Sequence, residues 1–224
     1  MKRNVTLEEI SDGRLYGIND MVKADCHGCE GCSKCCQGMG SSIVLDPLDV
    51  YQLTTNLGQT IEELLADALE LNVVDGVILP NLRMAGDKEQ CTFLNEEGRC
   101  SIHSFRPGIC RLFPLGRYYE NGSFQYFLQV NECESKLRSK VKVSKWIDTP
   151  QLQKNQEFIT KWHYLLNEVE EILGDNEDDT FRKNLNMFVL STFYLTAYDG
   201  NRDFYDQFHE RVERFREIVP ENGE

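Results

Sequence analysis

The chain has 224 residues, of which 24 are basic and 37 are acidic, so its formal net charge is −13. A chain this acidic is excluded as a general binder of nucleic acid or of anionic membrane surfaces, because both carry charge of the same sign. Hydrophobic residues make up 41% of the total, which excludes a largely disordered chain and allows a sizeable core. The most informative count is nine cysteines, five of which lie between Cys26 and Cys36.

The first residues lack the apolar stretch of a secretory signal, and the most apolar segment, residues 187–198, is too short and too polar to span a bilayer. We therefore expect a cytoplasmic protein with no membrane partner. In that reducing compartment, clustered cysteines bind metals or carry out redox chemistry more often than they form disulfides.

Three regions are predicted along the chain. Residues 1–25 show no clear periodicity and are expected to form an N-terminal arm. Residues 26–140 are expected to form a cysteine-cluster metal-binding domain. Its first segment has too few apolar residues to fold around itself, so a bound metal would have to organise it. Residues 145–224 are expected to form a helical C-terminal region packed on that domain.

Two short helices are predicted after the first cysteines. Asp46 and Pro47 are typical of an N-cap and a first helical residue, and Gly58 marks the end of that helix. Thr60 and Glu63 have the spacing of a capping box before a second helix.

Short strands and turns are predicted over residues 72–133. Asn121 and Gly122 are the strongest hairpin signal in the chain, because both residue types accept the left-handed backbone of a tight hairpin turn. Residues 95–98 indicate a second hairpin with a four-residue loop, whose flanking strands would bring Cys91 and Cys100 together.

Three helices without cysteine are predicted from residue 149 onward, over residues 149–174, 181–198 and 203–219. Their short connections favour antiparallel packing. The expected fold class is therefore α+β, mainly α, with a metal-organised cysteine-rich core containing short β-hairpins, followed by a C-terminal three-helix segment.

The cysteine spacing predicts metal chemistry. Two-residue gaps allow neighbouring thiolates to turn onto one metal centre, and the full set is large enough for two four-ligand sites. Cys26, Cys29, Cys32 and Cys36 have the C-x2-C-x2-C-x3-C spacing of bacterial ferredoxins. This pattern favours a [4Fe–4S] cluster, and zinc is the alternative metal.

Several motifs in the same order resemble the YkgJ-type CxxCxxCC cysteine-cluster family. These are Cys29-x2-Cys32-x2-Cys35-Cys36, then Cys91-x-Phe-Leu, Cys100-Ser-Ile-His, and Arg106-Pro107-x2-Cys110-Arg111. The family is described as zinc- or iron-chelating and includes flagellin lysine N-methylases, which use an iron–sulfur cluster and S-adenosylmethionine.

The resemblance implies a set of metal ligands and a reaction. The implied ligands are Cys29, Cys32, Cys35, Cys36, Cys91, Cys100, Cys110 and Cys133, with Cys26 preceding the motif as an additional candidate. The implied reaction is lysine N-methylation of a protein substrate with S-adenosylmethionine as cofactor. A non-catalytic protein with structural zinc, whose helical half binds a partner, is the alternative.

Two arginines flank Cys110. A guanidinium beside a thiolate cluster can offset its negative charge or bind a carboxylate of a cofactor, so Arg106 and Arg111 are candidate cofactor-binding residues. An ion pair with one of the many acidic residues is the alternative role for each.

Overall fold

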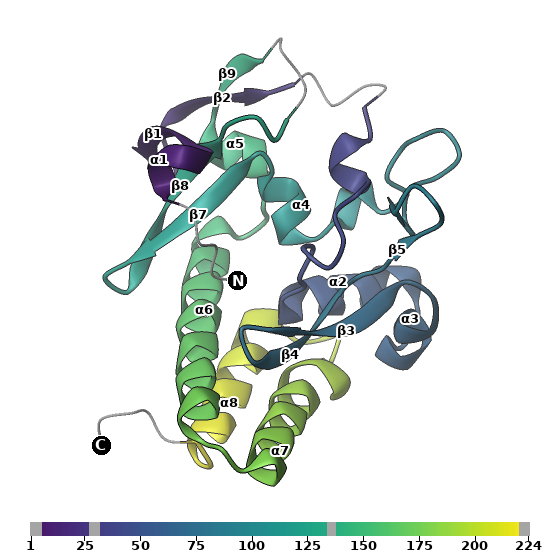
Figure 1. Ribbon diagram of the computed structural model, residues 1–224, viewed down its shortest axis with the longest axis vertical. Helices are drawn as coiled ribbons and strands as arrows, with labels where there is room; N and C mark the ends of the chain where they lie inside the picture. The colour runs from purple at the N-terminus through teal and green to yellow at the C-terminus, as the bar shows by residue number, and fades with distance from the viewer. Residues whose placement is uncertain (1–5, 27–31, 134–137, 220–224) are drawn as a thin grey trace. The chain divides into compact units, whose positions relative to one another are not determined.

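The computed structural model describes residues 6–26, 32–133 and 138–219 (Figure 1). It combines short antiparallel strand pairs with a larger share of helix and a helical C-terminal segment, which confirms the predicted α+β, mainly α, fold class. The chain divides into two compact units. The helical unit comprises residues 44–81 and 153–224 with Met1, and the cysteine unit comprises residues 2–43 and 82–152.

The first part of the helical unit contains the two short helices predicted from their caps. Helix α2, Pro47–Leu57, begins after Asp46, whose side chain accepts a hydrogen bond from the Asp49 N–H, and ends at Gly58 in the left-handed conformation. Helix α3, Ile61–Asp67, begins with a complete capping box between Thr60 and Glu63. These ends are confirmed because capping depends only on neighbouring residues.

Strands β3, Leu69–Val74, and β4, Val77–Leu82, form a two-stranded sheet in this unit. Asp75 and Gly76 connect them with φ values of 51° and 89°. Asn186 holds this hairpin to α7, because its side-chain oxygen accepts the Ile78 N–H at 2.7 Å and its amide donates to the Gly76 carbonyl at 3.3 Å.

The C-terminal helices are α6, Leu152–Asp175; α7, Asp179–Leu190; and α8, Phe204–Arg216. Aromatic residues make up much of their core, and the buried members include Phe158, Trp162, Phe193, Phe208 and Phe215. They contact one another edge-on or tilted, for example Phe158 and Phe208 with ring centroids 4.7 Å apart. Such contacts add to the stabilisation from apolar burial.

The helix predicted over residues 181–198 is not a single α-helix. After α7 the chain continues as a π-helical turn, Ser191–Leu195, labelled η4. The guanidinium of Arg211 on α8 donates hydrogen bonds to the carbonyls of Thr192, Thr196 and Ala197 at 2.7–2.8 Å. These carbonyls are at the helix end, where they have no intrahelical partner, so Arg211 stabilises the termination.

The cysteine unit begins with α1, Leu7–Ile10; β1, Ser11–Tyr16; and β2, Met21–Asp25. Strands β7, Leu115–Glu120, and β8, Ser123–Gln129, form an antiparallel hairpin, and β1 pairs with the other edge of β8. The turn residues Asn121 and Gly122 have φ values of 51° and 72°, which confirms the predicted hairpin.

The second strand pair of this unit is β2 with β9, Ser139–Lys142, and α5, Val143–Ile147, follows directly. Both strand pairs and α5 contribute to one apolar core. Its fully or nearly buried members are Val22, Ala24, Leu112, Leu115, Tyr126, Leu128, Val143 and Ile147.

Short elements complete the cysteine unit. They are η2, Lys34–Cys36; β5, Met84–Ala85; β6, Gln90–Cys91; η3, His103–Phe105; and α4, Gly108–Leu112. None of the helices among the described residues combines the length and apolar composition needed to cross a bilayer.

Candidate metal centre

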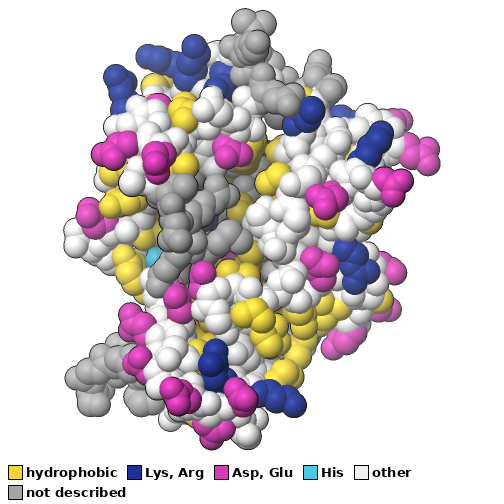
Figure 2. All heavy atoms as spheres, in the orientation of Figure 1, with side chains coloured by type: hydrophobic (Ala, Val, Ile, Leu, Met, Phe, Trp, Pro, Cys, Tyr) yellow, Lys and Arg dark blue, Asp and Glu magenta, His cyan; other side chains and the backbone are white. Residues whose placement is uncertain are grey.

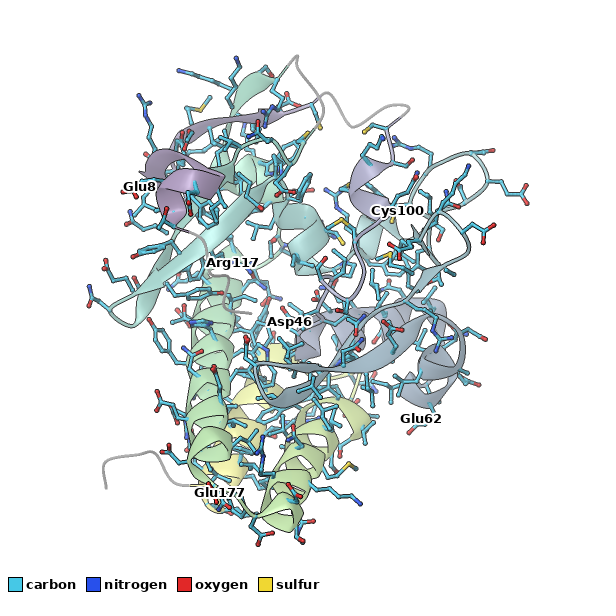
Figure 3. All side chains as sticks on the ribbon, viewed as in Figure 1. Glu8, Asp46, Glu62, Cys100, Arg117 and Glu177 are labelled. Atoms are coloured by element: carbon cyan, nitrogen blue, oxygen red, sulfur yellow. The ribbon has the colours of Figure 1, made fainter. Side chains whose placement is uncertain are left out.

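A pocket in the cysteine unit gathers cysteines from separate parts of the sequence. It encloses about 140 Å³. Six cysteines line it: Cys32, Cys35, Cys36, Cys91, Cys100 and Cys110. Figure 3 shows sulfur atoms around the labelled Cys100, close to η2 and α4. The eight cysteines that the structure describes are all thiols.

The first cysteine segment is held against β6 by backbone contacts. Cys35 and Cys36 lie on η2, a single turn closed by the Cys36 N–H donating to the Ser33 carbonyl at 2.9 Å. Gln37 then forms an antiparallel bridge with Gln90, and the Gly38 N–H donates to the Glu89 carbonyl at 2.9 Å. These bonds place the vicinal cysteines beside the strand that carries Cys91.

A tight turn brings Cys91 and Cys100 to the same pocket. Leu94 and Cys100 form an isolated bridge, and the Ser101 N–H donates to the Phe93 carbonyl at 2.8 Å. The predicted loop at residues 95–98 is therefore correct. The pairing beside it is limited to this bridge, and β6 instead pairs with β5. The proximity of Cys91 and Cys100 follows from the turn and not from a regular hairpin.

The two candidate arginines have different surroundings. Arg111 on α4 donates to three backbone carbonyls, those of Ser104, Arg106 and Asp148. It is not among the pocket-lining residues, whereas Arg106 is. Arg106 therefore has direct access to the thiols, and Arg111 stabilises the loop on which Arg106 lies.

The Arg106 guanidinium is only partly satisfied by the described residues. Its Nη1 lies 2.7 Å from Nε2 of His103. Because arginine is always a donor, Nε2 must accept this bond and the His103 proton must be on Nδ1. The Nε of Arg106 is buried and has no hydrogen-bond partner within the described residues. A buried guanidinium nitrogen without an acceptor is costly, so this nitrogen favours a bound anion.

Burial and neighbouring thiols disfavour ionisation of three of the pocket cysteines, Cys35, Cys91 and Cys100. The hydrogen bond between the Cys35 and Cys36 side chains, followed by burial, raises the pKa of Cys35. Burial is also the main cause that raises the pKa of Cys91 and of Cys100, while Arg106 acts in the opposite direction on Cys100. A bound metal cation would reverse this balance, because thiolates are the form that coordinates metals.

The donor set suits a thiophilic metal. Thiolates select zinc, copper(I) and iron–sulfur clusters over magnesium or calcium. Within the described ranges, no three His, Cys, Asp or Glu side chains already converge closely enough to hold an ion. Coordination of a metal by these cysteines would bring their sulfur atoms closer together.

Three of the predicted ligands are not placed in this pocket. Cys29 lies outside the described residues. Cys26 follows β2 and Cys133 follows β8; both are partly buried and neither lines the pocket.

The other residues that line the pocket were not predicted from the sequence. Glu132 and Gln129 contribute polar groups to it. Its apolar wall includes Met39, Ile43, Leu82, Met84, Ile109 and Phe113. No local pattern identifies these residues, because they come together only in the folded unit.

A comparison with protein-family models agrees with this site. The family model for the CxxCxxCC domain, described as "Putative zinc- or iron-chelating domain", matches residues 28–142. Searches of the curated proteins and of the solved structures find no significant match. The matched range contains the whole thiol pocket and confirms the resemblance, and it supports metal binding by this chain. The chain belongs to the CxxCxxCC family of cysteine-cluster domains.

Proposed function

We propose that the thiol pocket binds a [4Fe–4S] cluster. The observation that carries this proposal is that six cysteines line one pocket. Cys32, Cys35, Cys36, Cys91, Cys100 and Cys110 are the proposed source of the ligands, together with Cys29 from the family motif. Cys29, Cys32 and Cys36 keep the C-x2-C-x3-C part of the ferredoxin-type spacing, which supports iron over zinc. When bound, such a cluster supplies Lewis-acid or one-electron chemistry.

A second metal is proposed for the remaining thiols. A cubane cluster needs four thiolates, and this chain has nine cysteines. Cys26 and Cys133, which do not line the pocket, are the proposed additional ligands. Zinc is the proposed second metal, because it accepts thiolates in a closed tetrahedral site.

Anaerobic purification followed by iron, sulfide and zinc analysis tests these assignments. About four iron and four sulfide per chain are expected for one [4Fe–4S] cluster. Cys91→Ser and Cys100→Ser should lower the iron content, whereas Ser42→Ala, in the same pocket, should retain it. Cys26→Ser and Cys133→Ser should lower the zinc content alone. A protein with zinc and no iron would refute the cluster and favour a non-catalytic zinc protein.

We propose as the second function that this site methylates lysine in a protein substrate with S-adenosylmethionine. The family resemblance suggests this reaction, and the Arg106 surroundings support it. The Nε of Arg106 is buried and has no acceptor in the part of the chain that the structure describes, and a carboxylate could occupy that position. Arg111 is proposed to contribute by holding the Arg106 loop. The apolar wall would accommodate the less polar part of the ligand. The expected compartment is the cytoplasm, where thiols stay reduced.

Calorimetry on the cluster-loaded protein tests this second function. S-adenosylmethionine should bind, and its decarboxylated analogue should bind at least tenfold more weakly. Arg106→Gln should remove the difference between the two ligands. Equal affinity of the wild-type protein for both would exclude the carboxylate contact, and absence of binding would exclude the cofactor.

A further inference from the structure

The charges of the chain are segregated between the two units. The helical unit has eight basic and 23 acidic residues, a net charge of −15. The cysteine unit has 16 basic and 14 acidic residues, a net charge of +2. Within the helical unit, residues 44–81 contain seven acidic residues and no basic one. The net negative charge of the protein therefore lies in the helical unit, which contains no cysteine. All the charged residues of its segment 44–81, which includes β3, are acidic.

Strand β3 has an open edge along residues 70–74, within this acidic segment. Among the described strands it pairs with β4 alone, and residues 70–74 form no backbone hydrogen bond to any other described element. The opposite side of β4 is already occupied, because Val44 and Asn81 form a bridge and the Leu45 N–H donates to the Pro80 carbonyl at 2.9 Å. The sheet can therefore be extended at β3.

The same strand exposes large apolar side chains. Alternation places Leu69, Leu71 and Val73 on one face. Leu69 is buried, but Leu71 is 43% exposed and Val73 is 70% exposed, the highest value among the large hydrophobic residues that the structure describes. Met187, next to the Asn186 that holds the hairpin, is 47% exposed. Figure 2 shows hydrophobic side chains gathered in the area of β3, β4 and α7.

This edge lacks the usual protection against strand pairing. Natural edge strands are commonly blocked by lysine, proline or a bulge. Residues 69–74 are Leu-Glu-Leu-Asn-Val-Val and contain neither lysine nor proline. Glu70, the one charged residue, accepts hydrogen bonds from the amides of Asn72 and Asn81 at 3.1 and 3.0 Å.

We propose that β3 is a docking edge for a lysine- or arginine-rich extended segment of a partner protein, which adds to the sheet as a third strand. Backbone hydrogen bonds to β3 would give affinity, as in other cases of strand addition, and apolar residues of the partner would cover Leu71 and Val73. Glu62, Glu63 and Asp67 lie on α3, which contacts β3, and Asp75 lies in the hairpin turn, so these acidic residues would select basic over acidic segments. The only cations on α7 are Arg182 and Lys183, which do not offset this acidity.

The proposal goes beyond the metal chemistry and does not depend on it, since all of its residues lie in the helical unit. The test uses a fluorescent nine-residue peptide of alternating lysine and valine, titrated with the full chain in anisotropy experiments. Saturable binding is expected that weakens with added salt. The corresponding glutamate–valine peptide should bind at least tenfold more weakly. The lysine–valine peptide with N-methyl groups on all its amides should not bind, because it cannot donate to the β3 edge.

Matched variants locate the surface. The double variant Leu71→Thr, Val73→Thr keeps β-forming residues but removes apolar area, and it should weaken binding at least tenfold. Ile218→Thr removes an apolar side chain of similar exposure, 64%, elsewhere in the helical unit and should bind normally. Circular dichroism would verify that both variants fold.

Three results would overturn the proposal. Equal binding of the N-methylated peptide would mean that charge alone holds the peptide. Unchanged binding by the double threonine variant would place the site elsewhere. A concentration-dependent dimer that the double variant abolishes would mean that β3 pairs with a second copy. The Cys91→Ser variant should bind the peptide normally, so failure of the metal proposal leaves this test intact.

Discussion

Gln37 and Gln90 form an antiparallel β-bridge that joins the first cysteine segment to the strand carrying Cys91. The adjacent Gly38 N–H extends this contact by donating to the Glu89 carbonyl. The two segments are far apart in the chain, so their pairing brings the vicinal cysteines close to the remaining thiols. This connection therefore helps to form the thiol pocket.

Gly38→Val should therefore impair metal binding. Gly38 has a φ of 64°, which β-branched residues adopt at a cost of about 1–3 kcal/mol. An added Cβ would contact nothing within 4 Å, so backbone strain is the sole expected effect. Metal content per folded chain should fall at least severalfold.

Gly13→Val is the matched control for this change. Gly13 in β1 has a φ of 76° and equally open surroundings. It should cause a similar loss of stability while metal content stays normal. Equal metal content in the two variants would show that the bridge is dispensable for the site.

Substitution of Arg111 should lower the stability of the protein, whereas substitution of Arg106 should leave the stability nearly unchanged. Arg111→Gln removes three hydrogen bonds from a charged donor to backbone carbonyls and should lower the free energy of unfolding by about 2–4 kcal/mol. Arg106→Gln should change it by less than about 1 kcal/mol, because His103 is the one hydrogen-bond partner of its side chain among the described residues. Urea unfolding of the two variants measures the difference. The reverse order of stabilities would contradict the assigned roles.

Arg211 should be a major stabilising residue of the helical unit. Its guanidinium donates to three carbonyls at the end of η4 and lies 3.5 Å from the centroid of the Tyr198 ring. Arg211→Met should lower the free energy of unfolding by about 3 kcal/mol, since buried carbonyls lose their donors. Arg214→Met, on the same helix, removes no hydrogen bond to a backbone carbonyl among the described residues and should change it by under about 1 kcal/mol. Thermal unfolding followed by circular dichroism provides the comparison.

His163 should make the helical unit sensitive to acid. Burial lowers the pKa of His163 on α6 to about 4 from its usual 6.5. The folded state then binds fewer protons than the unfolded state between these values, so stability is lost as the pH falls from about 6.5 through about 4. Because the ring is partly exposed, we expect this loss to be about 1 kcal/mol.

His163→Gln should remove this part of the pH dependence. Urea unfolding of both proteins at pH 7 and pH 4.5 measures it, and the stability of the variant relative to the wild type should improve at the lower pH. A difference between the two proteins that does not change with pH would mean that His163 does not contribute to acid sensitivity.

Local patterns in the sequence determined the helix starts, the tight hairpin and the metal-binding character of the chain. Asp46, Thr60 and Asn121 act through residues two to four positions away, so their effects can be read without tertiary structure. The dense cysteines likewise predict a thiophilic site, because no other common role requires so many thiols in so few residues.

Only the tertiary structure decided which residues share the pocket. The pairing of Gln37 with Gln90, the contact of Arg111 with distant carbonyls, and the π-helical end stabilised by Arg211 join residues that are far apart in sequence. The open edge of β3 is also a property of the fold, since it depends on which strands find partners. Long-range contacts of this kind depend on the packing of whole elements, and no local sequence pattern specifies them.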